Sequence, residues 1–286
     1  MSLPRNPRAL EEAHKHCAAL ARLHAHDLWV GALYASPKAR DGLLALASFD
    51  YEIRQVRFRA RDPNLAALRL AWWRDIVRGE RDEEAFGSPV ALALRAAMDD
   101  FALLPAWLEA MLDAQLTELA PDEPFGLAEF EAFAAESEGA PLRLAAQIAA
   151  EGPDLDSAGP HVPAGMAVAL VRMLASLPAK AGRTLFPADV AARHGASVQD
   201  FDAGKTTAGV IAACAEVRAL ARVNSAEAER RLKSAPRAIL PAFAPLAALP
   251  LDLARLERNA ARPFEPAGEV LPIRRLWAIW RWARRR

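Results

Sequence analysis

Apolar residues along this chain recur at intervals of three and four residues over long stretches, whereas alternating β-branched runs are almost absent. That spacing follows the α-helical turn, and Ala and Leu, which favour helices, dominate the same stretches. No pattern recurs at the roughly 34- to 47-residue period of helical repeat proteins. We therefore expect an all-α bundle and not a solenoid.

Proline and glycine divide this pattern into predicted helices of about 10 to 25 residues. Ser36 before Pro37 and Asp62 before Pro63 each place an N-cap acceptor ahead of a proline at the first helical position. Helix breaks are expected at Pro37, Pro63, Gly87 to Pro89, Pro105, 121–126, 151–163, Pro187, Gly195, 236–250, and Pro263 with Pro266.

Length and composition indicate a globular protein. With 286 residues, 53% of them hydrophobic and 25% charged, the chain can bury a sizeable core. We expect a single domain over 1–268, followed by a basic amphipathic helix over 269–286. The 36 basic and 36 acidic residues balance, so no overall field favours nucleic acid, and we expect no nucleic-acid partner.

The cellular setting is inferred from cysteines and apolar windows. Cys17 and Cys214 match no metal or redox spacing, which favours two buried thiols in a reducing cytoplasm. The N-terminal residues lack the apolar core of a signal peptide, and no window reaches about 18 uncharged apolar residues. We expect a cytoplasmic protein, free or peripheral on the inner face of the membrane.

The segment 43–75, LLALASFDYEIRQVRFRARDPNLAALRLAWWRD, carries the most information about function. Its Leu-Ala-Trp-Trp-Arg-Asp run and the preceding SFDYEIRQV helix resemble the squalene/phytoene synthase family over roughly residues 20 to 215. The resemblance implies an isoprenoid-synthase-type helical fold. It also places Arg54, Gln55 and Phe58 where the family carries the aspartates of its first metal-binding helix.

The second metal-binding helix of that family resembles MLASLPAKAGRTLFP, residues 173 to 187. Alignment on Gly182, Arg183 and Pro187 places Leu174 and Pro178 at the aspartate positions. In the family, two aspartate-rich helices hold Mg²⁺ on a diphosphate leaving group. The resemblance therefore implies a family member without its paired metal ligands, in which no residue is expected to be catalytic and no metal is expected to bind.

Asp50 and Glu52 remain on the first helix, but residues two apart point to opposite sides and cannot share one cavity. Phe49, Glu52 and Ile53 resemble the Phe-x-x-Glu-[Ile/Leu] variant of an aspartate-less branch of the family. That branch includes an assembly factor of mitochondrial respiratory complex I.

Four basic residues, Arg54, Arg57, Lys180 and Arg183, would line or rim the old active-site cavity on this resemblance. Guanidinium groups pair with phosphate, so these residues are candidates for binding an anion directly. The alternative is that they pair with Asp and Glu across helices.

The final 16 residues hold six arginines, three tryptophans and no acid. On a helical wheel, Ile273, Leu276, Trp277, Ile279, Trp280 and Ala283 share one face, and Arg274, Arg275, Arg281, Arg285 and Arg286 lie opposite. Such a helix either docks on an anionic membrane, through candidates Trp277, Trp280, Arg281 and Arg285, or packs its tryptophans against the bundle.

The leading hypothesis for function is a catalytically degenerate family member that acts noncatalytically at a membrane, in the assembly of a respiratory complex with a protein partner. One alternative is an active head-to-head prenyl transferase that uses farnesyl or geranylgeranyl diphosphate with Mg²⁺. A second is a module that binds a prenyl lipid or quinone in an open cavity. Phe58 and Leu174 would fill that cavity if it is closed.

Overall fold

The computed structural model describes residues 6–59, 62–119, 126–152, 156, 159–179 and 185–285. Every regular element in these ranges is a helix, as the apolar spacing predicts. The elements in chain order are α1 (Pro7–His24), α2 (His26–Ala32), α3 (Pro37–Arg59), α4 (Pro63–Arg78), α5 (Asp82–Phe86), α6 (Pro89–Phe101), α7 (Pro105–Leu119), α8 (Leu127–Ala134), the π-turn η1 (Ala135–Gly139), α9 (Ala140–Ala150), α10 (His161–Ser176), the 3₁₀ turn η2 (Leu177–Ala179), α11 (Ala188–Arg193), α12 (Val198–Asp202), α13 (Ala208–Ser234), the 3₁₀ helix η3 (Arg237–Phe243), α14 (Ala244–Arg258) and α15 (Pro272–Arg285).

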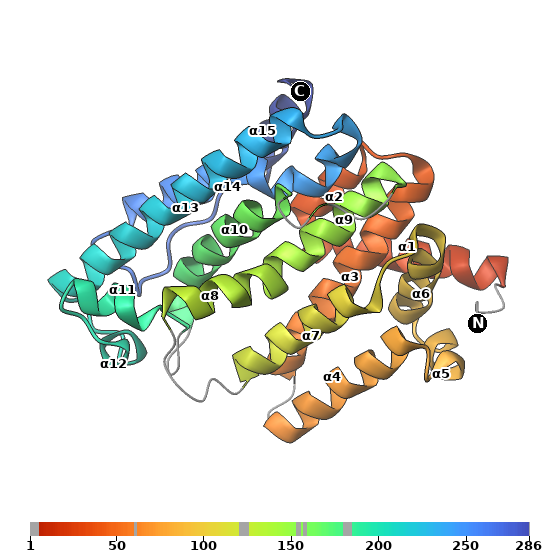
Figure 1. Ribbon diagram of the computed structural model, residues 1–286, viewed down its shortest axis with the longest axis horizontal. Coiled ribbons are helices and arrows are strands. Elements are labelled where there is room, and N and C mark those ends of the chain that lie inside the picture. The colour runs from red at the N-terminus through yellow and green to blue at the C-terminus, as the bar shows by residue number, and fades with distance from the viewer. Residues whose placement is uncertain are drawn as a thin grey trace.

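The helices form a bundle around one extended apolar core (Figure 1). On one side, α3 packs against α1, α2, α4, α6, α7 and α9, and on the other, α10 packs against α9, α13 and α14. Leu46 and Phe49 of α3 and Leu170 of α10 are almost fully buried. Helices far apart in the sequence thus meet along α3 and α10, which are the two helices that the family resemblance pairs.

The predicted caps and breaks hold at most positions. Ser36 Oγ accepts from the Ala39 amide at 3.1 Å ahead of α3, and Asp62 Oδ1 accepts from the Asn64 amide at 2.9 Å ahead of α4. Gly195 follows α11 at φ +67°, a conformation that glycine adopts without strain. Of the predicted break at 121–126, residues 121–125 lie outside the described residues, and Gly126 directly precedes α8.

The break expected over 236–250 is confirmed at Pro236, between α13 and η3, but it is wrong at Pro250, because α14 continues through that residue. A proline inside a helix loses a backbone hydrogen bond and costs about 3 kcal/mol. Leu246, Leu249 and Leu253 lie on the same face of α14, and all three are buried. Burial of each such side chain contributes about 2 kcal/mol, which is enough to keep the helix intact across the proline.

Two segments, His161–Ala179 and Arg237–Arg258, are long and apolar enough to cross a membrane by length and composition alone. Of their most apolar windows, 61% and 56% is buried inside the fold. They coincide with α10 and with η3 plus α14, which supply core residues of the bundle. Their apolar character therefore has an explanation within the fold.

Cys17 and Cys214 are both free and buried, as expected. Burial raises the pKa of the Cys17 thiol to about 11 and that of Cys214 to about 12. Because the thiolate is the reactive form, both thiols are poor nucleophiles near neutral pH.

The closest helix approach near the centre lies between α10 and the π-turn. A Cβ added to Gly165 would lie only 2.6 Å from the Gly139 backbone nitrogen, which is well inside contact distance. We expect Gly165→Ala to lower the free energy of unfolding by about 1 to 3 kcal/mol in urea denaturation, because the backbones must separate. Gly139→Ala is the matched control, since its Cβ would meet nothing closer than 3.6 Å. Equal losses in the two variants would contradict this packing account.

Candidate functional site

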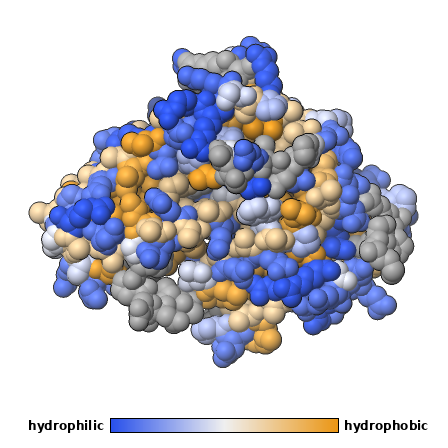
Figure 2. Space-filling model, in the orientation of Figure 1, coloured by the Kyte–Doolittle hydropathy of each residue, from blue (hydrophilic) through white to orange (hydrophobic). Residues whose placement is uncertain are grey.

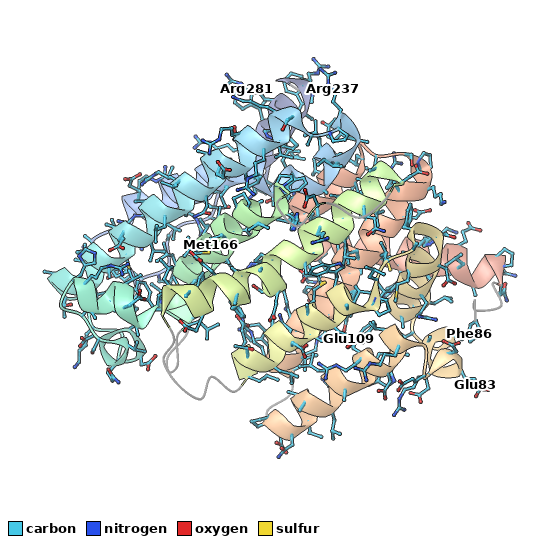
Figure 3. All side chains as sticks on the ribbon, in the orientation of Figure 1. Glu83, Phe86, Glu109, Met166, Arg237 and Arg281 are labelled. Atoms are coloured by element: carbon cyan, nitrogen blue, oxygen red, sulfur yellow. The ribbon has the colours of Figure 1, made fainter. Side chains whose placement is uncertain are left out.

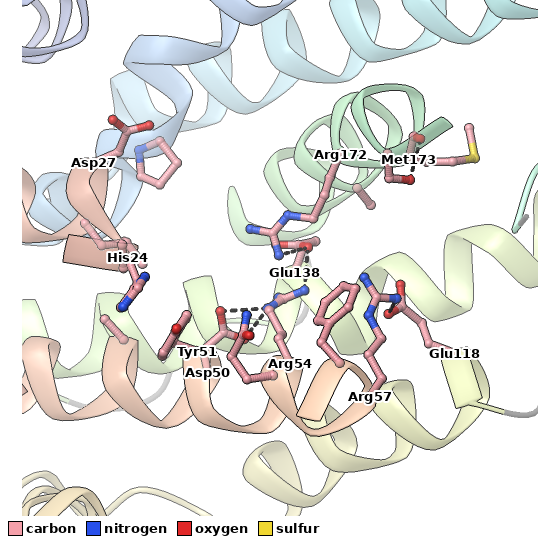
Figure 4. Close-up of a pocket in the computed structure, with 18 of the residues that line it drawn as sticks. His24, Asp27, Asp50, Tyr51, Arg54, Arg57, Glu118, Glu138, Arg172 and Met173 are labelled. Atoms are coloured by element: carbon pink, nitrogen blue, oxygen red, sulfur yellow. Dashed lines mark hydrogen bonds and ion pairs between the residues drawn. The ribbon is translucent and has the colours of Figure 1, made fainter. Parts of the chain in front are cut away.

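The largest hollow near the predicted site is a cavity of about 500 Å³ between α3, the π-turn and α10 (Figure 4). Its wall combines apolar side chains with four carboxylates and four arginines. The charged residues are Asp27, Asp50, Glu118, Glu138, Arg54, Arg57, Arg172 and Arg275. The cavity is therefore open but charged, and it is not the apolar tunnel expected of a lipid-binding module.

Arg54 lies at the centre of this charged wall. Its Nε donates to both carboxylate oxygens of Asp50, one turn earlier on α3, at 2.8 Å. Its Nη2 donates to the Ser137 carbonyl oxygen at 2.6 Å, and its Nη1 lies 3.1 Å from Glu138 Oε1. The Arg54 guanidinium thus joins α3 to the π-turn through Ser137 and Glu138. Figure 4 shows its contacts with Asp50 and Glu138.

The π-turn positions the second set of partners of Arg54. It interrupts the continuous helical run of α8 and α9, and its wider spacing changes which carbonyl oxygens meet the usual helical donors. The close approach of Gly165 to Gly139 holds this turn against α10. As a result Glu138, with a side chain only 8% exposed, lies within reach of Arg54 and also of Arg172, whose Nη1 is 2.9 Å away.

Arg57 and Phe58 occupy the rim of the cavity. Arg57 Nη1 donates to Glu118 Oε2 of α7, and its guanidinium lies 4.5 Å from the centre of the Phe58 ring. The Phe58 side chain is 67% exposed. Phe58 therefore does not fill the cavity, although it stands at a position that the resemblance assigns to a metal ligand.

The opposite end of the cavity is closed by a pair from distant parts of the chain. Asp27 of α2 lies 2.5 Å from an amino group of Arg275 of α15. Burial raises the pKa of Asp27, an effect that the neighbouring Arg275 opposes. Nearby, the rings of His24 and Tyr51 stack at 4.1 Å, so His24 serves here as a packing partner.

Electrostatics hold Arg54 in its charged form. Burial disfavours that charge, but the carboxylates of Asp50 and Glu138 outweigh it and raise the pKa of Arg54. Each of the four carboxylates on the wall contacts an arginine. These ion pairs can fix the helices to one another. Because each carboxylate is engaged by an arginine, none of the four is free to transfer a proton. Among the described residues, no three His, Cys, Asp or Glu side chains gather to hold a metal ion.

Of the other residues that carry the family resemblance, some pack in the core and others form contacts near the surface. Phe49 and Trp73 pack edge to face at 5.1 Å in the core, and Trp72 Nε1 donates to Glu84 at 2.7 Å. Glu52 pairs with Arg59 at 3.0 Å on another groove, so Asp50 and Glu52 do point to different sides, as predicted.

The segment 173–187 borders the charged cavity through Met173, Ser176 and Leu185, but the two positions assigned to aspartates lie elsewhere. Leu174 is 3% exposed in α10, and with Pro178 it borders a separate hollow. Lys180 and Arg183 lie outside the described residues. The anion-binding role of Arg54, Arg57, Lys180 and Arg183 stays a prediction, with the addition that Arg54 and Arg57 already have carboxylate partners.

Sequence reasoning missed four of the eight charged wall residues: Asp27, Glu118, Glu138 and Arg172. Glu138 is brought to the site by a π-turn, which leaves no recognisable spacing in the sequence. Glu118 and Arg172 come from α7 and α10 and reach the site only through packing. The one usable signal was the unusual arginine at position 54, because a buried guanidinium requires acidic partners.

The sequence profile of a family described as squalene/phytoene synthase matches residues 21–280. Curated relatives named NADH dehydrogenase (ubiquinone) complex I, assembly factor 6, include those of Mus musculus and Homo sapiens. Both are 23% identical to this chain; the alignments cover 94% and 93% of this chain, and 82% and 81% of the relatives.

Solved structures share the fold. A squalene synthase from Alicyclobacillus acidocaldarius superposes with a TM-score of 0.74 at 18% identity, over 90% of this chain and 98% of the other. A dehydrosqualene synthase superposes with a TM-score of 0.79 at 13% identity, over 98% and 99%. The predicted isoprenoid-synthase-type fold is confirmed.

We expect Arg54→Met to lower the free energy of unfolding by about 3 kcal/mol, because Asp50 and Glu138 would keep buried charge without their shared cation. Arg172→Ala is the matched control, since it removes a half-exposed arginine from the same Glu138 and should cost less than about 1 kcal/mol. Urea denaturation of both variants measures the difference. Similar losses for the two would show that Arg54 is not the centre of the network.

Proposed function

The chain belongs to the squalene/phytoene synthase family, and we propose that it is a catalytically degenerate member that acts as a noncatalytic, membrane-associated factor in the assembly of a respiratory NADH dehydrogenase. A fold by itself does not fix a function, so the proposal rests on the site and on the relatives.

The observation that carries the proposal is the position of Arg54. The family resemblance assigns this position to an aspartate that would hold Mg²⁺, and here a guanidinium occupies it. Arg54 forms ion pairs with Asp50 and Glu138, so the protein supplies its own fixed positive charge to the cavity wall. The Arg54 guanidinium, which is part of the chain, takes the place of the Mg²⁺ that the family holds between two helices.

Mg²⁺ fits these residues poorly. It prefers near-octahedral oxygen ligands, usually one or two carboxylates together with water and substrate phosphate. Asp50, Glu118 and Glu138 are each bound by an arginine, and the guanidinium of Arg54 would repel a divalent cation between α3 and the π-turn. Ionisation of an allylic diphosphate requires charge neutralisation on the leaving group. Arg54 and Arg57 already pair with carboxylates of the protein.

The relatives support the assembly role. Assembly factor 6 relatives align with this chain over more than nine-tenths of its length. The chain also carries Phe49, Glu52 and Ile53, a pattern that resembles the aspartate-less branch of the family. Binding of a prenyl lipid or quinone is the second candidate function; the charged wall disfavours it, and the apolar side chains of Phe130, Phe133 and Met173 in the same wall favour it.

We expect purified protein to release no inorganic diphosphate from labelled farnesyl or geranylgeranyl diphosphate with Mg²⁺ beyond a protein-free blank. Turnover on the order of 1 s⁻¹ or faster, the ordinary range of enzymes, would overturn the noncatalytic assignment. Saturable binding of farnesyl diphosphate without diphosphate release would instead favour the lipid-binding candidate. A bacterial squalene synthase in the same assay is the positive control.

The assembly role makes a second prediction. Deleting the gene in its native host should reduce the fully assembled NADH dehydrogenase seen on native gels, and a plasmid copy should restore it. A copy with Arg172→Ala should restore it equally, since that variant is expected to fold. Unchanged NADH dehydrogenase in the deletion strain, together with loss of a prenyl product, would contradict the proposal.

A further inference from the structure

The C-terminal helix α15 divides its apolar residues between two faces. Ile279 is 1% exposed and packs with Val30 of α2 and Ala244 of α14, and Trp282 packs against the main core. By contrast Ile273, Trp277 and Trp280 are 67%, 56% and 41% exposed. From the sequence, this helix was expected either to pack against the bundle or to face outward. In the structure one side of the helix packs against the bundle, and the opposite side faces outward.

The inner side of α15 is held by an ionic anchor. Arg275 contacts Asp27 of α2 at 2.5 Å and Asp252 of α14 at 2.6 Å. The Arg275 side chain is 24% exposed and those of the two acids are 20% and 13%. Because this anchor and the Ile279 contact face the bundle, the rotation of α15 is fixed and its outer side is presented to solvent.

The outer side forms an apolar stripe with a basic border. Residues 273, 277 and 280 are spaced by four and three, so they lie along one face of the helix. The guanidinium of Arg281 lies 5.1 Å from the Trp277 ring and that of Arg284 lies 4.3 Å from the Trp280 ring. No carboxylate of the described residues pairs with Arg281 or Arg284.

The basic border extends beyond α15 itself. Arg237 of η3 is exposed, and it lines a groove with Ile279 and Trp282. Figure 3 shows Arg237 and Arg281 projecting from the same end of the molecule. Hydrophilic side chains cover much of that end in the space-filling view (Figure 2). Two separate elements thus contribute positive charge to one end.

We propose that the outer face of α15, made by Ile273, Trp277 and Trp280 with Arg274, Arg281 and Arg284 around it and Arg237 at the same end of the molecule, docks on an anionic lipid bilayer. The inference deepens the proposed function, on whose membrane association it rests, by naming the surface and its partner. Tryptophan favours the interface between headgroups and acyl chains, and arginines attract anionic lipids. Exposed Ile273 adds a side chain that an acidic protein surface would not require. Arg285 lies in α15, but its side chain is outside the described residues.

This docking surface would face the membrane without unfolding of the helix or release of its anchor. The stripe lies nearly parallel to the axis of a 14-residue helix, which is about 21 Å long and can lie flat in the headgroup region. Arg275 and Ile279 remain inside the protein. The bundle would therefore approach the bilayer in one orientation, with the end that carries Arg237 and Arg281 toward the lipid.

Flotation of the full chain with vesicles tests the proposal. We expect the protein to float with equimolar phosphatidylcholine and phosphatidylglycerol vesicles and to remain at the bottom with phosphatidylcholine alone. Trp277→Ser/Trp280→Ser should weaken partitioning at least about tenfold, because it removes apolar area that is exposed in the free protein. Arg281→Gln/Arg284→Gln should weaken it about 30-fold at low salt.

Matched controls use exposed residues elsewhere on the surface. Leu65→Ser/Leu68→Ser removes two exposed leucines of α4, and Arg8→Gln/Arg69→Gln removes two exposed arginines; both should float as the parent does. Helical circular dichroism verifies that all variants are folded.

Three outcomes would overturn the docking surface: no flotation of the parent protein, unchanged flotation of the tryptophan variant, or equal flotation with uncharged vesicles. Binding to polyglutamate without flotation would assign the surface to an acidic protein instead. These outcomes are separable from failure of the proposed function, because diphosphate release and NADH dehydrogenase assembly are measured independently. Restored assembly by a variant that no longer floats would leave the docking surface in place and contradict only its role in assembly.

Discussion

The structure depends on how the positive charge of Arg54 is buried. A guanidinium that leaves water must gain carboxylates and hydrogen-bond acceptors of good geometry, or the fold loses several kcal/mol. Asp50 comes from the same helix, whereas Glu138 and the Ser137 carbonyl come from a π-turn on another. The relative placement of α3, the π-turn and α10 is therefore tied to one side chain, and the cavity takes its charged character from it.

Under the proposed function, this constraint supplies the cohesion that a metal ion would give to a pair of acidic helices. Where two acidic helices repel each other, a divalent cation can hold them together, but the association then depends on the ion. Here the cation is part of the chain, and Arg172 of α10 adds a second, more exposed contact to Glu138. The large aromatic pair Phe49 and Trp73 packs beside this wall as part of the core. The chain keeps the helical frame of the family, and the polar residues of its cavity wall hold the helices together.

Helix α15 adds an outward surface to that frame. Its inner residues Arg275 and Ile279 tie it to α2 and α14, and Arg275 also borders the charged cavity. Trp277 and Trp280 face outward because the inner face is already satisfied. The same helix thus closes one end of the cavity and presents an amphipathic surface, so that the site and the proposed docking surface are linked through a single rigid element.

The sequence by itself determined the helical class, the N-caps before Pro37 and Pro63, and the frame of the fold, because apolar spacing and capping chemistry are local. It also placed Arg54 in the cavity wall through the family resemblance. Tertiary structure alone decided the partners of Arg54, since Glu138 arrives through a π-turn that has no sequence signal. It likewise overrode the expected break at Pro250, where leucine burial outweighs a lost hydrogen bond. In α15 the helical wheel found one apolar face, but only packing against α2 and α14 could divide it into a buried side and an exposed one.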